Sequence, residues 1–192
     1  MIIAGVDEAG RGALAGPVVA GAVVLGDLKP IAQITDSKVL TDTQRRECFK
    51  WIKDHCDWAT GIIFAQEIDQ IGIKKATEKA MNQAVEKLRQ REKITHLKVD
   101  GRDRFTFPID SEDIVGGDGK VVEISAASIV AKVVRDDIMI DLDHKYPLFG
   151  FSHNKGYGAT DHMQLVSGGE YCVEHRKTYD PLKTFLSQHR LF

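Results

Sequence analysis

The sequence predicts an α/β protein: a mixed sheet flanked by helices, followed by a helical C-terminal extension. Three observations carry this prediction. Short β-branched runs of strand length occur near the start, at residues 2–6 and 18–25. Further along, apolar residues recur at spacings of three and four, which is typical of amphipathic helices. Strands first follow one another and then alternate with helices, so the sheet should begin antiparallel and continue parallel.

The first half of the chain contains the clearest local signals. Thr41 and Gln44 have the spacing of a capping box, which predicts a helix from Thr41 to about His55. Apolar residues at helical spacing predict a second helix from Ile73 to about Gln90. The strands expected here, all rich in valine and isoleucine, are residues 2–6, 18–25 and 61–65.

The second half is expected to add two strands and a long helix. Residues 95–99 form a short strand that ends at Asp100, and residues 102–119 read as a loop. Residues 121–124 are expected as another strand, and residues 125–143 as a helix. Short helical pieces follow, which makes about 145–192 the helical C-terminal part of one domain that spans residues 1–192.

The composition is that of an ordinary globular domain. The chain has 192 residues, of which 43% are hydrophobic and 28% charged. A chain of this length can bury a sizeable core. The net charge of −2 means that a polyanion would have to be held by a local patch and a bound metal. No stretch is long and apolar enough to span a membrane, and the start lacks the basic part of a signal peptide. Three cysteines without metal spacing fit reduced thiols, so we expect a cytoplasmic protein.

A segment near the start carries the most chemistry. Asp7 and Glu8 follow the apolar run 1–6 and precede the turn Gly10-Arg11-Gly12. Two adjacent acids repel each other, so a cation is expected to hold them. They can serve one site only if the strand bends or ends there, because side chains alternate along a strand. The arginine adds a charge-assisted donor beside a backbone that a ligand can approach closely. Acids for a metal beside donors for a phosphate indicate phosphodiester chemistry.

Two later acids are candidates for the same site. Asp100 ends a strand and fits a turn or a site equally well, whereas Asp118 alone looks like a loop acid. Its string Gly116-Gly117-Asp118-Gly119-Lys120 is not a P-loop, because Val121 stands where serine or threonine is needed. Carboxylates without histidine or cysteine select magnesium or manganese. Two such ions can activate a water and stabilise the leaving oxygen.

Aromatic and imidazole side chains gather after residue 145. Tyr157 stands between glycines in Lys155-Gly156-Tyr157-Gly158 and offers either a stacking face or a cap on the core. Four histidines are too irregularly spaced for a zinc site and are expected to be satisfied on the surface or in the core. They are His153, His162, His175 and His189.

Six motifs together identify a known family. They are residues 7–12 with Gly16-Pro17, 36–40 (Asp-Ser-Lys-Val-Leu), 99–101, 117–118 with 125–133, 154–158 and 175–181. In this order they make the chain similar to ribonuclease HII, the bacterial type 2 ribonuclease H, nearly end to end. The resemblance implies a ribonuclease H-like fold and cleavage of the RNA strand of RNA–DNA hybrids. It also implies nicking on the 5′ side of single ribonucleotides in duplex DNA, which leaves 3′-hydroxyl and 5′-phosphate ends.

The resemblance also assigns roles to residues. A catalytic quartet that binds two Mg²⁺ or Mn²⁺ ions would be Asp7, Glu8, Asp100 and Asp118. Gly10, Arg11 and Gly12 would sense the 2′-hydroxyl, and Tyr157 would read the RNA-to-DNA junction. Lys38 and Lys132 are candidate phosphate contacts. The expected partners are RNA–DNA hybrids and ribonucleotide-containing duplex DNA, and no membrane. The resemblance further implies a monomer that a replication or transcription protein can recruit.

Some residues depart from the family pattern, and two alternatives stay open. Gly116 replaces a common lysine, Gly72 a frequent asparagine and Ala159 a frequent threonine, but no catalytic acid is lost. One alternative is ribonuclease HIII, a sister enzyme with an extra N-terminal domain and a lysine in place of the turn arginine. Arg11 argues against it. The other alternative is a catalytically silent nucleic-acid-binding module on the same scaffold.

Overall fold

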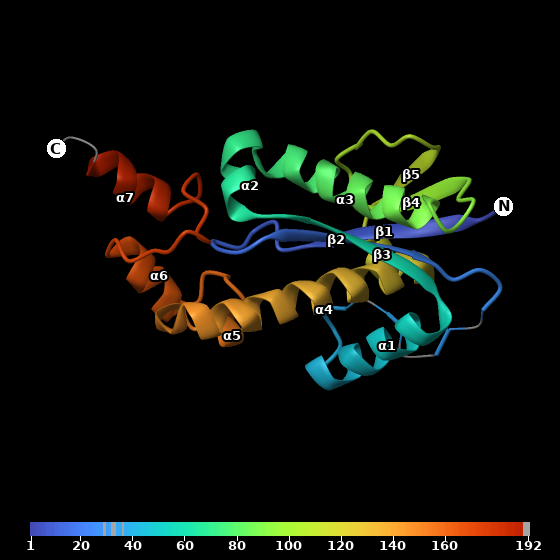
Figure 1. Ribbon diagram of the computed structural model, residues 1–192, viewed down its shortest axis with the longest axis horizontal. Coiled ribbons are helices and arrows are strands. Elements are labelled where there is room, and N and C mark those ends of the chain that lie inside the picture. Colours follow the sequence, from blue (N-terminus) through green and yellow to red (C-terminus); the bar gives the residue numbers. More distant parts are fainter. Residues whose placement is uncertain (29, 32–33, 36, 190–192) are drawn as a thin grey trace.

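The computed structural model describes residues 1–28, 30–31, 34–35 and 37–189. Asp36 of the Asp-Ser-Lys-Val-Leu motif lies outside the described residues. One five-stranded sheet forms the centre of the molecule, with helices on both faces (Figure 1). The C-terminal helices gather at one end of the sheet, shown in orange and red. The predicted fold class is therefore confirmed.

The sheet has the expected mixture of strand directions. Its order is β3-β2-β1-β4-β5. β1 pairs antiparallel with β2 and parallel with β4, which places the ends of β1 and β4 at one edge of the sheet. The strands are β1 (Ile3–Ala9), β2 (Val18–Val24), β3 (Asp57–Ile63), β4 (His96–Asp100) and β5 (Ser111–Ile114).

Helices cover both faces of the sheet. α2 and α3 pack on one face, whereas α1 and the long α4 pack on the other (Figure 1). The capping box at Thr41 is formed as predicted: Gln44 donates its backbone N–H to the threonine hydroxyl. The helices are α1 (Asp42–His55), α2 (Ala65–Ile71), α3 (Ile73–Arg89), α4 (Val122–Lys145), α5 (Phe151–Asn154), α6 (Thr160–Ser167) and α7 (Leu182–Gln188).

Small residues on the central strands let α4 lie unusually close to the sheet. A Cβ at Gly5 of β1 would stand 2.1 Å from the carbonyl of Glu123, and one at Gly21 of β2 would stand 2.4 Å from that of Ala127. Larger residues at these two positions would push the helix away. Because side chains alternate along β1, Asp7 faces α4 as Gly5 does. The close approach therefore brings α4 beside Asp7.

Three sequence-based boundaries are wrong. Residues 121–124 are not a strand, because Val122 begins α4; β-branched residues are tolerated in a helix that packs on a sheet. Residues 102–119 contain β5 and a 3₁₀ turn at Gly117–Gly119. The third strand runs from Asp57 to Ile63, earlier than residues 61–65, and Ala65 already belongs to α2.

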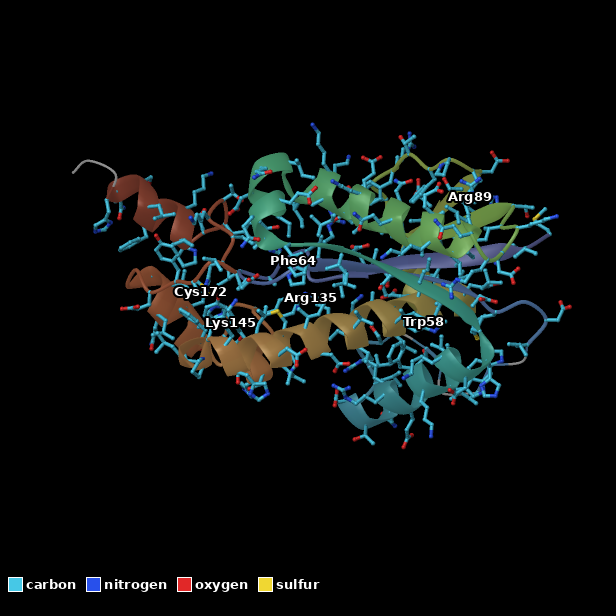
Figure 2. All side chains as sticks on the ribbon, viewed as in Figure 1. Trp58, Phe64, Arg89, Arg135, Lys145 and Cys172 are labelled. Atoms are coloured by element: carbon cyan, nitrogen blue, oxygen red, sulfur yellow. The ribbon has the colours of Figure 1, made fainter. Side chains whose placement is uncertain are left out.

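The C-terminal part is helical, as expected. It contains α5, α6 and α7, and irregular chain between them returns to the connection between β1 and β2. Figure 2 shows Arg135 and Cys172 near this end of the sheet. None of the described helices is long and apolar enough to cross a membrane.

Candidate active site

Three of the predicted acids converge at one edge of the sheet. Asp7 comes from β1, Asp100 ends β4, and Asp118 lies in the 3₁₀ turn before α4. Each offers a carboxylate oxygen, and these oxygens lie within 4.8 Å of one another. We call Asp7, Asp100 and Asp118 the acid cluster. The parallel pairing of β1 with β4 and the close approach of α4 together explain the convergence.

Asp7 lies at the centre of the acid cluster and is 4% exposed. Its Oδ1 accepts the backbone N–H of Glu8 at 2.7 Å. A second bond from the Ser128 side chain also favours the charged form. Burial nonetheless raises the pKa of Asp7 well above its ordinary value, and the charges of Glu8 and Asp100 raise it further. A bound cation would offset this desolvation and repulsion, so the residues present fit a divalent metal ion.

Backbone and side-chain donors hold the other two acids. The N–H of Gly117 donates to Asp100 Oδ1 at 2.7 Å, which ties the 3₁₀ turn to the end of β4. Ser125 donates to the carbonyl of Asp118 at 2.6 Å. The Lys38 ammonium contacts Asp118 Oδ2, also at 2.6 Å. Lys38 is thus a cation already placed at the edge of the acid cluster.

Glu8 lies beside the acid cluster but is not one of its three members. β1 continues through Glu8 to Ala9, so the strand does not end at the acid pair and the two side chains take opposite faces. Burial raises the pKa of Glu8, and the Arg11 guanidinium at 3.5 Å partly opposes that rise. Glu8 still lines the same cleft as Asp7 and Asp100.

The cleft over the acid cluster brings most of the predicted substrate residues together. Gly10, Lys38, Lys132 and Tyr157 line it, whereas Arg11, Gly12 and Asp118 are not among its described lining residues. Arg11 instead contacts Asp103 at 2.7 Å as well as Glu8. The full lining is Asp7, Glu8, Ala9, Gly10, Ser37, Lys38, Asp100, Ser128, Lys132 and Tyr157.

Two fully buried arginines hold the connection between β1 and β2, which begins with the turn at residues 10–12. Arg176 donates to the carbonyls of Gly10 and Arg11 at 2.7 and 2.8 Å, and to that of Gly16 at 2.9 and 3.1 Å. Arg135 donates to three other carbonyls, of Ala15, Pro17 and Lys155, at 2.9 to 3.2 Å. We call Arg135 and Arg176 the arginine clamp. Gly10, with φ of 96°, has no room for a Cβ, which would stand 2.0 Å from Arg135 Nε.

Tyr157 lines the cleft beside Arg135 of this clamp. Its ring lies 5.0 Å from the Arg135 guanidinium and 5.7 Å from the Lys132 ammonium. The residue is 37% exposed, so its ring can still meet a ligand. Lys132 also contacts the buried Asp136 at 2.7 Å, which holds its ammonium near the tyrosine.

Sequence reasoning missed the residues that support this site. The hydroxyls of Ser37 and Ser128 form a hydrogen bond of 2.7 Å. Because Ser128 also bonds to Asp7, this links the segment that carries Lys38 to the acid cluster. Both serines stood inside the quoted motifs, yet a serine carries no signal of its own. Asp103 and the role of the arginine clamp were also missed, although Arg176 stands in the motif 175–181. Their partners lie far away in the chain; Arg176 and Arg11, for example, are 165 residues apart.

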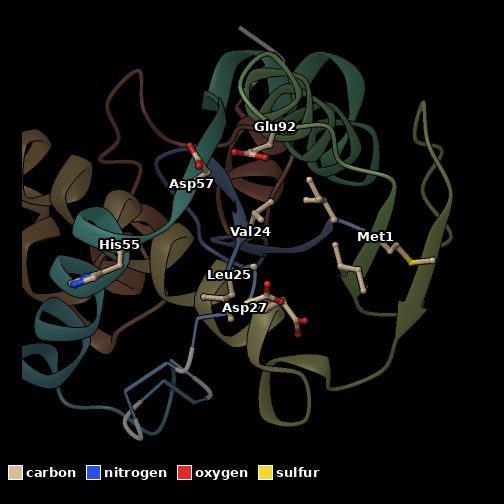
Figure 3. A pocket seen from close by; sticks show the side chains of 11 residues that line it. Met1, Val24, Leu25, Asp27, His55, Asp57 and Glu92 are labelled. Atoms are coloured by element: carbon tan, nitrogen blue, oxygen red, sulfur yellow. The ribbon is translucent and has the colours of Figure 1, made fainter.

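A second hollow opens at the opposite end of β1 and β2 (Figure 3). Its acids are Asp27, Asp57, Glu92 and Glu123, and His55 stands at its rim. In the part of the chain that the structure describes, no three of these residues bring ligand atoms within 4.8 Å of one another as the acid cluster does. Acid content alone therefore does not mark a metal site.

Comparisons with known proteins agree with this geometry. The family model for ribonuclease HII matches residues 4–174. A ribonuclease HII from Chromobacterium violaceum is 44% identical over 190 residues, which cover 98% of this chain and 95% of that protein. The ribonuclease H2 structure from Pyrococcus horikoshii OT3 covers all of both chains with a TM-score of 0.79 at 27% identity. An Archaeoglobus fulgidus ribonuclease HII, solved in complex with PCNA, has a TM-score of 0.75 at 23% identity over 93% of this chain and 95% of that one. The chain belongs to the ribonuclease HII family and is a type 2 ribonuclease H.

Proposed function

We propose that this protein cuts the RNA strand of RNA–DNA hybrids and nicks duplex DNA on the 5′ side of a single ribonucleotide. The products would carry 3′-hydroxyl and 5′-phosphate ends. The observation that carries the proposal is the single cleft in which buried acids, a glycine turn and an exposed tyrosine meet. Membership of the ribonuclease HII family supports it.

The acids are proposed to hold two divalent ions. Asp7, Asp100 and Asp118 would be ligands, and Glu8 would join them from the opposite face of β1. Only oxygen ligands are offered, which favours Mg²⁺ or Mn²⁺ over softer metals. When bound, the ions supply an activated water and a partner for the leaving oxygen. Ser128 and the N–H of Gly117 orient two of the carboxylates before any ion arrives.

The cleft wall is proposed to read the sugar and hold the phosphates. The 2′-hydroxyl distinguishes RNA from DNA at a given nucleotide, and the glycine backbone at residues 10–12 lets a sugar come close. Tyr157 would stack on the next sugar and leave no room for a second hydroxyl. Lys132 and Lys38 would contact phosphates, as point charges. The pairing of Arg11 with Glu8 and Asp103 favours a role for Arg11 in shaping the turn beside the sugar.

The remaining properties are proposals of the same kind. Residues 1–192 would act as one catalytic domain, in the cytoplasm and as a monomer. A protein of the replication or transcription machinery would recruit it. The Archaeoglobus fulgidus relative bound to PCNA supports a partner of that type.

The test is a nicking assay on a duplex that contains one ribonucleotide, beside a long RNA–DNA hybrid. We expect cutting of both substrates with Mg²⁺ or Mn²⁺ and none with chelator. Extension of the nicked strand by a polymerase would verify the 3′-hydroxyl end. Asp100→Asn should lower cutting by more than about a hundredfold, since even outer-shell changes at metal sites cost ten- to a hundredfold.

The matched control is an acid of the second hollow. Asp27→Asn should cut like wild type, because Asp27 lies at the far end of the sheet. If the wild-type protein bound both duplexes without cutting either, this proposal would be wrong and the protein would be a catalytically silent nucleic-acid-binding module. Asp100→Asn with wild-type activity would also overturn it.

A further inference from the structure

Two buried histidines form a pair beneath the loop that carries Tyr157. His162 of α6 and His175 are 0% and 1% exposed, and their Nε2 atoms lie 2.9 Å apart. The rings of Phe149 and Phe151 surround the pair, with Phe149 4.6 Å from His175. The cleavage proposed above uses neither imidazole. A buried polar pair without a catalytic task calls for another explanation.

The neighbours of the pair fix where its protons lie. The backbone N–H of Cys172 donates to His175 Nδ1 at 3.0 Å, so that nitrogen carries no proton. His175 therefore holds its proton on Nε2 and donates it to His162 Nε2. That leaves the proton of His162 on Nδ1, from which it donates to the carbonyl of Tyr157 at 2.8 Å. A one-way chain of hydrogen bonds thus runs from Cys172 through both rings to Tyr157.

Both imidazoles are neutral in this arrangement. Burial and the neighbouring His162 together lower the pKa of His175 to about 4. Burial also lowers the pKa of His162, against the opposing charge of Asp161. Because neither ring is charged at neutral pH, the tautomers are set by the backbone groups at the two ends of the chain.

The last bond of this chain reaches the backbone of Tyr157. On one side, the preceding residue is held against the connection between β1 and β2: the backbone N–H groups of Leu14 and Ala15 both donate to the carbonyl of Gly156, at 2.8 and 3.2 Å. On the other side, His162 holds the Tyr157 carbonyl. The tyrosine ring, which faces the cleft, therefore projects from a backbone that is fixed on both sides.

We propose that His162 is a positioning residue for Tyr157, with His175 fixing its tautomer, and that the pair sets how strictly the enzyme reads the sugar beside the cut. This inference rests on the proposed junction-reading role of Tyr157. Losing the bond should displace the ring and weaken recognition of a single ribonucleotide. The acid cluster, which the pair does not touch, should keep cutting a long hybrid.

Paired substitutions test this directly. His162→Leu removes the donor, whereas His162→Asn places an amide N–H near the position of Nδ1. The rate on a single-ribonucleotide duplex, divided by that on a long hybrid, should fall about tenfold in His162→Leu, in line with one lost hydrogen bond. In His162→Asn, this ratio of rates should return most of the way to the wild-type value. His153→Leu, at an exposed histidine of α5, should leave the ratio unchanged.

A double substitution separates positioning from folding. In a Tyr157→Ala background, His162→Leu should not lower the ratio further, because the residue it positions is gone. An equal loss on both substrates, or an unchanged loss in the Tyr157→Ala background, would mean that the pair only stabilises the fold. If His162→Leu fails to fold, His175→Gln against His175→Leu makes the same comparison, since glutamine keeps a donor near Nε2.

Nitrogen NMR of the imidazoles tests the pair without any activity. At pH 7 we expect His162 protonated on Nδ1 and His175 on Nε2. Any other tautomer, or a charged ring, would overturn the inference even if the enzyme cuts as proposed. A wild-type protein that cuts the hybrid but ignores single ribonucleotides would overturn the junction-reading function, and with it the specificity part of this inference, whereas the NMR result would stand by itself.

Discussion

The acid cluster and the arginine clamp both bury charge, yet they are built in opposite ways. In the acid cluster, like charges face one another, and burial together with repulsion raises the pKa of Asp7. In the arginine clamp, each guanidinium is met by backbone carbonyls, with six residues supplying the acceptors. Burial lowers the pKa of Arg176 to about 10, so it remains charged at neutral pH.

This difference distinguishes a group of charges suited to binding a cation from one that the protein's own hydrogen bonds satisfy. Buried charge is tolerated when hydrogen bonds or counter-charges satisfy it, and the carbonyls do this for the clamp. In the acid cluster, Lys38 meets Asp118 at the edge, but burial and repulsion still disfavour the charge on Asp7, which a bound divalent cation would offset. We therefore expect the clamp to govern stability and the acid cluster to govern response to metal.

Removing the clamp should have the largest effect on folding. In Arg176→Met, the carbonyls of Gly10, Arg11 and Gly16 lose the bonds from the guanidinium. The Arg11 carbonyl keeps the bond from the Tyr179 hydroxyl, whereas the Gly16 carbonyl loses two. Each unsatisfied buried group costs about 1–3 kcal/mol, so the free energy of unfolding should fall by about 3 kcal/mol or more. Denaturant titration measures it.

Arg46→Met is the matched control, since the half-exposed Arg46 pairs with the surface acids Asp42 and Asp137. This substitution should cost less than about 1 kcal/mol. An equal loss of unfolding free energy in both variants would contradict the stabilising role of the clamp.

Neutralising one acid should leave stability intact and remove the response to metal. Asp100→Asn relieves repulsion and keeps an oxygen for the N–H of Gly117, so its melting temperature without metal should not fall. Mg²⁺ at a hundred times its Kd should stabilise the wild type by about 2.7 kcal/mol. The variant should gain much less at the same concentration. A thermal-shift titration with a chelator control measures this, and a variant as responsive as the wild type would contradict the assignment.

Tyr157 is where the two regions meet, since its ring lies on Arg135 of the clamp and faces the cleft of the acid cluster. Tyr157→Ala should reduce cutting at a single ribonucleotide about tenfold more than cutting of a long hybrid, because stacking contributes about 1–3 kcal/mol. Tyr157→Phe keeps the ring and serves as the control. Parallel rate measurements on the two substrates decide it, and equal losses would count against a junction-reading role.

Local chemistry explains which parts of the fold could be predicted. The capping box at Thr41 and the apolar spacing from Ile73 to about residue 90 depend on neighbours within a few residues, and both helices formed. Residues 121–124 failed because their β-branched side chains indicate a strand, whereas packing of α4 on the sheet decides for a helix. Tertiary contact outweighed propensity there.

The site residues show the same difference between features set by neighbours in the sequence and features set by tertiary contacts. Adjacent acids beside a glycine turn indicated Asp7 and Glu8, but Asp118 looked like a loop acid until the family resemblance singled it out. Its closeness to Asp7 depends on the approach of α4 at Gly5 and Gly21, which a single sequence does not reveal. Arg176 was not foreseen because each of its acceptors lies at least 160 residues away.

The histidine pair extends the comparison to pH, with the smallest expected effect. The unfolded chain binds a proton at His175 below about pH 6.5, whereas the folded protein does so only near pH 4. The stability that His175 contributes is therefore complete above pH 6.5 and is lost as the pH falls toward 4.

Between pH 7.5 and 5.5 this loss should be about 1 kcal/mol. At His162, the charge of Asp161 opposes the lowering of the pKa, and Tyr157 meets the ring through its backbone carbonyl. Cys172 meets Nδ1 of His175 through its backbone N–H and through its thiol, at 3.3 Å. Denaturant titrations at several pH values should show a flatter profile for His175→Gln than for wild type or His153→Gln. Parallel profiles in all three would place the acid sensitivity in other groups, with the raised pKa of Asp7 acting in the opposite direction.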